Sequence, residues 1–397
     1  MKKRSTGLVA RGIRTGLIKE GDNLIKITTD SLLETAENEG FEFRNRDIVA
    51  VTESLVARAQ GNYVTAEEIG KDVVKKFGKG EIGVLFPIFS RNRFFSILKA
   101  ICTAPEITKI HLQLHLPKDE QGNNLVEDEI FIKSGVNAHN AVLTATEFRE
   151  IFSAEQRKHR FTGMDYLDLY QNISPKLNII LSNDPTAILA ATKKVLIAHV
   201  HNRPLTKKRL EGAGAEIVYS TGDIMTKPAT RKDGGRSGYC PDYGLLGSNM
   251  SKEGVLKLFP RDGQKFVDKL AAELKKKTGK NIEVMIYGDG AFKDPVGGIW
   301  ELADPVVSPA FTAGLEGTPD ELKLKYLTDS EGLEEKEVLA KLKAKKKQTL
   351  NNQARLGTTP RQNTDILGSL ADLVSGSGDR GTPVVLIQGF FDNLSDD

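Results

Sequence analysis

The chain has little cysteine, a single tryptophan and no long hydrophobic run, and these absences exclude several classes of protein. Its 397 residues include two cysteines, Cys102 and Cys240, which are too few for a disulfide framework or a cysteine zinc site. No apolar run reaches the roughly 20 residues of a membrane-spanning helix, so we expect no membrane association. The basic start at residues 1–4 is not followed by the apolar segment of a signal peptide. These observations predict a cytoplasmic protein.

The chain also has no large excess of positive or negative charge, because its formal net charge is only +3 at pH 7. A protein that binds the nucleic-acid backbone needs a stronger basic excess, so we expect no nucleic-acid partner. The basic run at residues 341–347 lies in a charged helical stretch and is interpreted as a solvent-exposed helix face. Hydrophobic content of 39% and charged content of 27% are typical of a globular protein of two or three domains.

The segment Val284–Glu301 carries the strongest local signal. Val284–Tyr287 is a short apolar run that ends in turn residues, a pattern typical of a buried strand. Gly288 and Gly290 then allow a positive φ and a close approach of the backbone to a ligand. Asp289 therefore stands at the end of a strand, where a carboxylate can hold a hard cation. Taken alone, the segment fits a solvated Asp-Gly turn equally well.

Hydrophobic periodicity predicts alternating strands and helices along most of the chain. Thr65 is the expected cap of a helix that begins at Ala66 and ends near Gly78. The other expected elements are strands over 47–51, 177–181, 195–200, 215–219 and 284–287, and helices over 185–192, 205–212, 264–277 and 320–347. The alternation within 177–219 indicates a small parallel α/β subdomain.

A strand is also expected over Ile110–Leu116, which alternates with a period of two. His111, Gln113 and His115 should therefore share one face of this strand. Histidines four residues apart on a strand lie too far apart to ligate one metal readily, so no metal site is expected there.

Four segments, taken in order, resemble the coenzyme F-420-0:L-glutamate ligase (γ-glutamyl ligase) family. Ile18–Leu24 looks like the family's Ile-x-Pro-Gly-Asp-Asp-Leu. Asp47–Gly61 is similar to its Asp-Val-Leu-Val-Val-Thr-Gln-Lys-Ile-Val-Ser-Lys-Ala-Glu-Gly. Leu256–Asp289 follows the family's order of strand, Pro-x-Asp, helix, Thr-Gly-Lys, strand and Asp. Leu370–Gly389 looks like the family's final helix, loop and strand.

The resemblance implies an α+β or mixed α/β fold, with a ligase core of mixed sheets and helices. The family's Ala-Gly-Val-Asp-Ala-Ser-Asn is followed shortly by a strand and Pro-x-Asp. Ser134–Asn140 fills this motif, but the strand before Pro260 arrives only after a long interval. We therefore expect residues 1–140 and 254–397 to share a single core, with residues 141–253 as an inserted small α/β subdomain.

A second segment, Gly244–Asn249, competes for the same motif, with Leu246 where the aspartate belongs. The first segment has Asn137 at that position, and an amide oxygen can still ligate a metal whereas a leucine cannot. The first match is therefore preferred, and Asn140 then corresponds to the family's nucleotide-contacting asparagine.

The family forms an amide between a substrate carboxylate and the amine of L-glutamate. It uses a nucleoside triphosphate, GTP or else ATP, with Mn²⁺ or Mg²⁺, and K⁺ is a further cation to consider. A carboxylate is a poor electrophile, so it first accepts the γ-phosphoryl group, and the glutamate amine then attacks the acyl phosphate. Such a site needs carboxylates for the metal, cations for the phosphates, and glycines where backbone N–H groups meet phosphate. The expected acceptor is coenzyme F-420-0 or a related pterin or folate.

The resemblance also implies the residues of the site. Asp289 and Arg58 are the catalytic candidates, and Arg58 stands at the family's lysine. Metal candidates are Asp289, Asn137 and Asp294, the last of which is chosen only because it lies near Asp289 in sequence. The nucleotide-contacting candidates are Thr15, Gly16, Leu17, Ile18, Glu53, Ser54, Arg58, Asn140, Ser375, Gly376 and Ser377.

Two departures from the family pattern affect the expected metal site. Asn137 replaces an aspartate, and Gly290 replaces a hydroxyl residue beside Asp289. The alternative to a ligase is therefore a non-catalytic nucleotide- or metabolite-binding protein that retains the fold. The resemblance further implies a homodimer.

Overall fold

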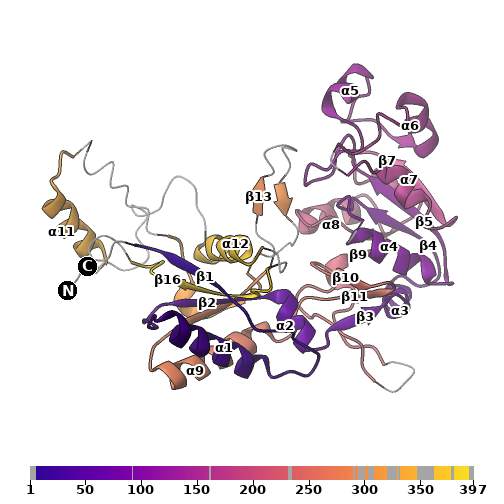
Figure 1. Ribbon diagram of the computed structural model, residues 1–397. Coiled ribbons are helices and arrows are strands. Elements are labelled where there is room, and N and C mark those ends of the chain that lie inside the picture. The colour runs from indigo at the N-terminus through magenta and orange to yellow at the C-terminus, as the bar shows by residue number, and fades with distance from the viewer. Residues whose placement is uncertain are drawn as a thin grey trace. The chain divides into compact units, whose positions relative to one another are not determined.

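The computed structural model shows an α+β fold made of two compact units (Figure 1). It describes residues 6–91, 93–160, 162–230, 235–288, 291–293, 300–302, 308–319, 329, 331–346, 362–376 and 380–392. The first unit consists of Met1–Ala59, Asp262–Gly290 and Val306–Asp397, and the second of Gln60–Arg261 and Ala291–Pro305. Each unit has its own sheet and helices, which agrees with the mixed fold class expected from the sequence.

The first unit is built on a five-stranded sheet in the order β1-β16-β2-β12-β15. Its strands are β1 (Val9–Ile13), β16 (Val384–Gln388), β2 (Ile48–Thr52), β12 (Glu283–Tyr287) and β15 (Ala310–Phe311). β2 and β12 are parallel, and the other neighbouring pairs are antiparallel. Strands β1, β2 and β12 therefore all end at one edge of the sheet, which is also the edge where β16 begins.

Helices cover both faces of this sheet. In Figure 1, α1 (Leu24–Glu39) and α9 (Gly263–Thr278) lie on one face and α12 (Asn363–Ser375) lies on the other. Within β2, Val49 and Val51 pack in the core with α1 and α9, whereas Ile48 and Ala50 pack in the core with α12. Successive strand residues point to opposite faces, so burial on both faces explains why β2 is apolar at consecutive positions.

The remaining described elements of the first unit are shorter or lie outside the sheet. They are α2 (Glu53–Ala59), α11 (Glu335–Lys346) and a 3₁₀ turn at Ala313–Leu315. α11 forms part of the helix expected over 320–347. Residues 320–328, 330 and 347 of that stretch lie outside the described residues.

The second unit is built on a six-stranded sheet in the order β6-β7-β5-β4-β8-β9. Its strands are β4 (Gly80–Leu85), β5 (Ile107–Leu114), β6 (Leu143–Thr144), β7 (Leu177–Leu181), β8 (Lys194–Ile197) and β9 (Ile217–Ser220). All pairs are parallel except that of β6 with β7. The helices are α3 (Ala66–Phe77), α4 (Phe94–Thr103), α5 (Asp128–Lys133), α6 (Ala145–Ile151), α7 (Tyr166–Gln171) and α8 (Arg203–Gly212), with 3₁₀ turns at Ala187–Ala190 and Thr221–Asp223.

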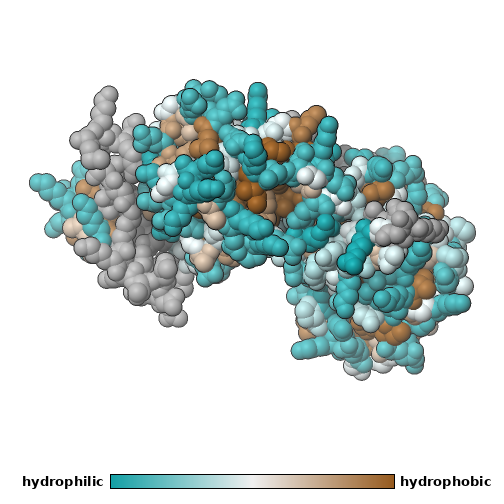
Figure 2. Space-filling view, turned by 90° about the horizontal axis from the view of Figure 1, so that it is seen from below, coloured by the Kyte–Doolittle hydropathy of each residue, from teal (hydrophilic) through white to brown (hydrophobic). Residues whose placement is uncertain are grey.

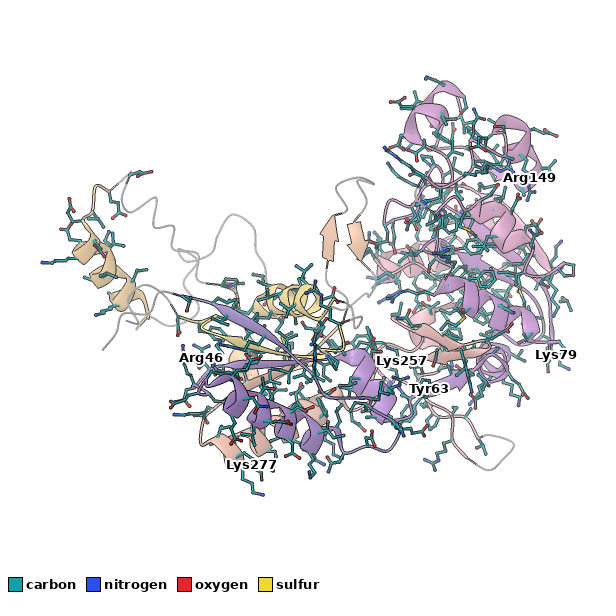
Figure 3. All side chains as sticks on the ribbon, in the orientation of Figure 1. Arg46, Tyr63, Lys79, Arg149, Lys257 and Lys277 are labelled. Atoms are coloured by element: carbon teal, nitrogen blue, oxygen red, sulfur yellow. The ribbon has the colours of Figure 1, made fainter. Side chains whose placement is uncertain are left out.

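A three-stranded sheet joins the two ends of the segment Gln60–Arg261. Its order is β10 (Asn249–Lys252), β11 (Val255–Lys257) and β3 (Tyr63–Thr65), with Tyr63 opposite Lys257 (Figure 3). The backbone N–H of Arg261 donates to Gln60 Oε1 at 2.9 Å, and Gln60 Nε2 donates to the Arg261 carbonyl at 2.6 Å. The segment therefore starts and ends at one place. A separate hairpin of the second unit pairs β13 (Ala291–Lys293) with β14 (Trp300–Leu302).

The domain boundary predicted at residue 140 is wrong. Strands β4 and β5, which were assigned to the ligase core, pair directly with β8 and β7 of the predicted insertion. Residues 60–140 therefore do not share a core with the rest of the first segment, and the chain divides at residues 60 and 261 instead. The parallel α/β character expected for 177–219 is confirmed, but within this larger sheet.

Most local predictions are confirmed, with two exceptions. Thr65 caps α3 in a full capping box, in which Glu68 Oε2 accepts from the backbone N–H of Thr65 at 2.7 Å. The helix expected over 185–192 is only the 3₁₀ turn Ala187–Ala190. β5 ends at Leu114, so His115 lies just beyond the strand that contains His111.

The two histidines have separate partners. His111 Nε2 lies 2.8 Å from Glu81 Oε2, and His115 Nδ1 lies 2.9 Å from Asn183 Oδ1. They therefore do not act as a pair.

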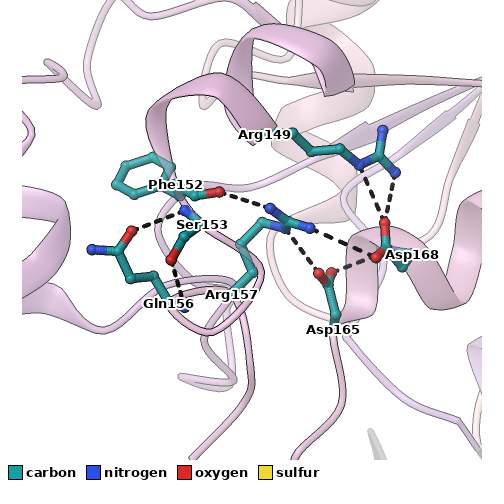
Figure 4. A network of polar contacts seen from close by, with 7 residues as sticks. All are labelled: Arg149, Phe152, Ser153, Gln156, Arg157, Asp165 and Asp168. Carbon is teal, nitrogen blue, oxygen red and sulfur yellow. Dashed lines mark hydrogen bonds and ion pairs between the residues drawn. The ribbon is translucent and has the colours of Figure 1, made fainter.

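Ion pairs around the buried Arg157 hold the region between α6 and α7 (Figure 4). Arg157 Nε donates to Asp165 Oδ2 at 2.8 Å, and Arg157 Nη1 donates to the Phe152 carbonyl at 2.7 Å. Asp168 lies at the other side of the same guanidinium and also accepts from Arg149 at 2.7 Å (Figure 4). Because Arg157 is buried, these contacts fix the loop that precedes α7.

Hydrophilic residues cover most of the face that Figure 2 shows, and hydrophobic residues form smaller patches there. Among the helices that the structure describes, none is both long enough and apolar enough to cross a membrane.

Candidate functional site

Four chain segments that are far apart in sequence converge on one edge of the five-stranded sheet. Ile13, Val384, Val51 and Ile286 lie side by side in adjacent strands and form a row across the sheet. One strand residue advances about 3.3 Å, so positions two residues beyond this row all lie at the same edge. The segments that follow β1, β2 and β12 and the segment that precedes β16 are therefore neighbours at this edge.

Predicted site residues occupy this edge. Thr15 lies two residues beyond the end of β1, and Glu53 and Ser54 directly follow β2. Asp289 is the second residue after β12, but Asp289, Gly290 and Asp294 lie outside the described residues. The structure therefore brings together the loops after β1 and β2 and the end of β12, as the resemblance requires.

The loop after β1 is anchored at two points. Ile18 is buried in the core with α1, and the backbone N–H of Gly21 donates to the Ala59 carbonyl at 2.9 Å. Gly16 has a φ of +69°, a conformation that favours glycine, and the neighbouring Leu17 is 88% exposed. The loop thus presents Thr15–Leu17 outward while its far end is held beside α2.

Helix α2, which directly follows β2, carries the exposed cation Arg58. Ser54 and Arg58 are exposed and one helical turn apart, so they share a face, whereas Glu53 is buried. Arg58 has no hydrogen bond or ion pair to any of the described residues. Its guanidinium is therefore available for an anionic ligand.

Sequence reasoning missed Thr382, which precedes β16 at this edge. Its Oγ1 is buried without a hydrogen-bond partner among the described residues. Gly12 lies against it, since a Cβ at Gly12 would come within 2.8 Å of Thr382 Cβ. The only sequence signal was its place in Gly381-Thr-Pro383 before a buried strand. A buried hydroxyl without a partner is rare enough to suggest that a ligand satisfies it.

The end of α12 has mainly a structural role. The hydroxyl of Ser375 is buried and donates to the Asp372 carbonyl at 3.0 Å. Gly376 is the left-handed C-cap of the helix, with a φ of 61°. Ser377 lies outside the described residues. Of the three predicted contacts, two are therefore engaged in ending the helix.

Asn137 and Asn140 belong to the second unit. Both are exposed in a turn after α5, where Asn137 Oδ1 accepts from the backbone N–H of His139 at 3.0 Å. After this turn the chain enters β6 and α6, and no Pro-x-Asp follows. The succession of motif, strand and Pro-x-Asp that the family pattern requires is thus missing here.

The competing segment Gly244–Asn249 has that succession. Asn249 begins β10, β11 follows at once, and Pro260-Arg-Asp262 comes next. Leu246 is buried, and the buried Ser248 Oγ has no hydrogen-bond partner among the described residues. The order of elements therefore favours Gly244–Asn249 as the match to the family motif, rather than the segment Ser134–Asn140 preferred from the sequence.

The described residues alone do not form a metal site. No group of three or more His, Cys, Asp or Glu side chains in the described ranges is arranged to hold a metal ion. A metal at the sheet edge would depend on Asp289 and Asp294, which are outside those ranges.

The fold and the edge define a two-unit α+β protein in which loops from distant parts of the chain gather at the strand ends of one sheet. The family model described as F420-0:Gamma-glutamyl ligase matches residues 12–389, nearly the whole chain. The chain therefore belongs to this family, which supports a ligase role in coenzyme F420 biosynthesis. The comparison with curated proteins finds no match.

Proposed function

We propose that the chain is a nucleotide- and metal-dependent γ-glutamyl ligase that joins L-glutamate to a carboxylate acceptor through an acyl phosphate. The acceptor class is coenzyme F-420-0 or a related pterin or folate, and the nucleotide is GTP or ATP. The observation that carries the proposal is the convergence of the loops after β1 and β2, the end of β12 and the start of β16 at one edge.

The residues of this edge suit the binding of phosphates. Arg58 can donate two hydrogen bonds to one phosphate group, and its exposed position leaves it free to do so. Gly16 permits a close approach of the backbone, and Ile18 and Gly21 hold that loop in place. Asp289 is the proposed ligand of a divalent cation, which when bound would neutralise charge on the phosphate oxygens.

We further propose that Asn249, in place of Asn140, corresponds to the asparagine of the family's motif. The support is the order of elements, because β10, β11 and Pro260 follow Asn249 directly. Neither candidate segment has an aspartate at the metal-ligating position, since one has Asn137 and the other has Leu246. The proposed metal site therefore rests on Asp289 and Asp294.

Calorimetric titration of Mn²⁺ with GTP, and separately with ATP, tests the site. Arg58→Ala should weaken nucleotide binding about 10- to 100-fold, since a charge-assisted hydrogen bond contributes about 1.5–3 kcal/mol. Asp289→Asn should weaken the Mn²⁺-dependent part of binding and slow phosphoryl transfer about 100-fold. The matched control is Lys277→Ala, an exposed cation at the end of α9, just before the opposite end of β12 (Figure 3). It should bind as the wild type does.

Equal affinities in wild type, Arg58→Ala and Asp289→Asn would mean that the site is wrongly placed. Phosphate release that depends on both L-glutamate and an acceptor measures the ligase step itself. Tight nucleotide binding without such release, for coenzyme F-420-0 and folate acceptors alike, would favour the non-catalytic binding protein. The proposed homodimer is tested separately by sedimentation, where a monomer at micromolar concentration would contradict it.

A further inference from the structure

The six-stranded sheet of the second unit has a topological switch point. From β4 the chain moves through β5 to β7 on one side, and then returns to place β8 and β9 on the other side of β4. Connections that leave β4 and β8 therefore run in opposite directions. In open parallel sheets of this kind, ligands bind beside the carboxyl ends of the strands at the switch point.

Chemically active side chains gather at that point. Phe86 directly follows β4, and its ring stacks on His115 after β5 with centroids 3.6 Å apart. The ring of His199, two residues after β8, meets Phe86 edge-on at 6.2 Å. Phe86 also has a φ of +54°, an unusual backbone conformation for a bulky residue. We refer to Phe86, His115, Glu120, His199 and Arg203 as the switch-point cluster.

The acidic groups near the cluster already have partners. Glu120 Oε1 accepts from the backbone N–H of Val200 at 2.5 Å, and Glu120 Oε2 lies 3.5 Å from His199 Nδ1. Asp184, after β7, pairs with Arg209 at 3.2 Å. Asp223 accepts from the backbone N–H of Ser220 at 2.7 Å. Each of these three carboxylates therefore has a hydrogen-bond or ion-pair partner within the unit.

Arg203, in the first turn of α8, makes no side-chain hydrogen bond or close ion pair to the described residues. Its Nη1 atom is buried, and no hydrogen-bond acceptor lies within reach of it. Burial lowers the pKa of the guanidinium, and the carboxylates of Glu120 and Asp223 only partly offset this. A buried guanidinium N–H group without an acceptor is costly, even on a half-buried side chain, and an oxyanion would satisfy it.

A metal ion is the alternative occupant suggested by the histidines. His115, His199 and Glu120 are held by other hydrogen bonds, and within the described ranges no group of three or more His, Cys, Asp or Glu could hold a metal. The chemistry at this edge therefore favours an anion.

We propose that the switch-point cluster is a second ligand site, which binds a small molecule through an oxyanion group, a phosphate or a carboxylate, paired with Arg203. All residues of this site belong to the second unit. It goes beyond the ligase function, because none of its residues belongs to the nucleotide site proposed there.

Histidine NMR of the full chain can test this site without interference from the first unit. All six histidines fall within Gln60–Arg261, so binding at the first unit's edge has no histidine of its own unit to report it. Protein labelled at histidine ¹³Cε1 is titrated with inorganic phosphate in one arm and with acetate in the other. Resonances are assigned by single His→Gln variants.

The cluster histidine His199 should shift on titration, together with the neighbouring His115 and His201. His111, His139 and His159 lie elsewhere in the unit and should not shift. A response to phosphate assigns a phosphate-bearing ligand, and a response to acetate assigns a carboxylate. No response in either arm would overturn the proposal.

Two variants on α8 complete the test. Arg203→Gln should weaken the response about tenfold or more, because it removes a charge-assisted contact. Lys208→Gln removes the same charge from the exposed side of the same helix and should respond as wild type. Unchanged resonances of His111 and His159 in Arg203→Gln show that the unit is folded. A wild-type response in Arg203→Gln would refute the assignment.

Discussion

Replacing Asn62 with alanine should loosen the place where the chain enters and leaves the second unit. The side chain is fully buried, and its Nδ2 donates to the carbonyls of Phe259 at 2.7 Å and Tyr239 at 3.0 Å. Its Oδ1 accepts from the backbone N–H of Tyr239 at 3.0 Å and from Arg261 Nη1 at 2.7 Å. One amide thus connects β3 to two later segments of the unit.

The magnitude follows from the groups that Asn62→Ala leaves without a partner. Two carbonyls, one backbone N–H and one guanidinium N–H lose their hydrogen bonds, and each buried unsatisfied group costs about 1–3 kcal/mol. Arg261 keeps its bond to the Gln60 carbonyl at 2.8 Å, and water can satisfy part of the rest. We expect the free energy of opening this region to fall by about 3–5 kcal/mol.

Native-state hydrogen exchange measured by mass spectrometry is the appropriate assay. Peptides that cover residues 60–65 and 238–261 should lose protection in Asn62→Ala, whereas peptides from α1 and α9 should not. Asn172→Ala, an exposed asparagine of the same unit, is the matched control and should leave exchange unchanged. An opening free energy within about 0.5 kcal/mol of wild type would refute the reasoning.

Three further predictions concern the second unit. Burial raises the pKa of Asp119 to about 6. The protonated carboxyl therefore contributes stability that is fully present below the ordinary carboxyl pKa and is lost as the pH rises through 6. Asp119→Asn should flatten this part of the pH profile of urea unfolding. Gly244→Ala should lower stability by about 3 kcal/mol or more in thermal unfolding, because its Cβ would lie 2.4 Å from the Gly222 carbonyl oxygen at a φ of +55°. Arg157→Ala should cost about 3–5 kcal/mol in urea unfolding, because it removes a buried guanidinium and leaves the half-buried Asp165 carboxylate without its partner; a smaller loss in Arg157→Ala/Asp165→Ala would confirm the pairing.

Local signals made much of the fold predictable from the sequence. The cap at Thr65, the amphipathic pattern of α9 and the apolar runs of β2 and β12 each depend on neighbouring residues, so they were found at nearly the right positions. The weaker segment at 185–192 forms only a 3₁₀ turn. A segment this short shows too little periodicity to distinguish a turn from a helix.

Non-local pairing explains the errors. The partners of β4 are β5 and β8, and β8 begins more than a hundred residues later, so no window of sequence could reveal that they share a sheet. The boundary at residue 140 failed for this reason. The choice between Ser134–Asn140 and Gly244–Asn249 could not be made from the sequence, because both resemble the same motif and only the elements that follow distinguish them. Thr382 was missed because burial of its hydroxyl depends on Gly12, at the other end of the chain.

The hydrogen bonds between Gln60 and Arg261 have a consequence for the history of the gene. Because the two ends of this segment touch, the flanking residues Ala59 and Asp262 are already close, and a short peptide could join them directly. A single in-frame insertion or deletion at this point could therefore add or remove the whole segment without changing the order of strands in the five-stranded sheet. The same closeness makes residues 60–261 a natural unit to express alone or to circularise through their own termini.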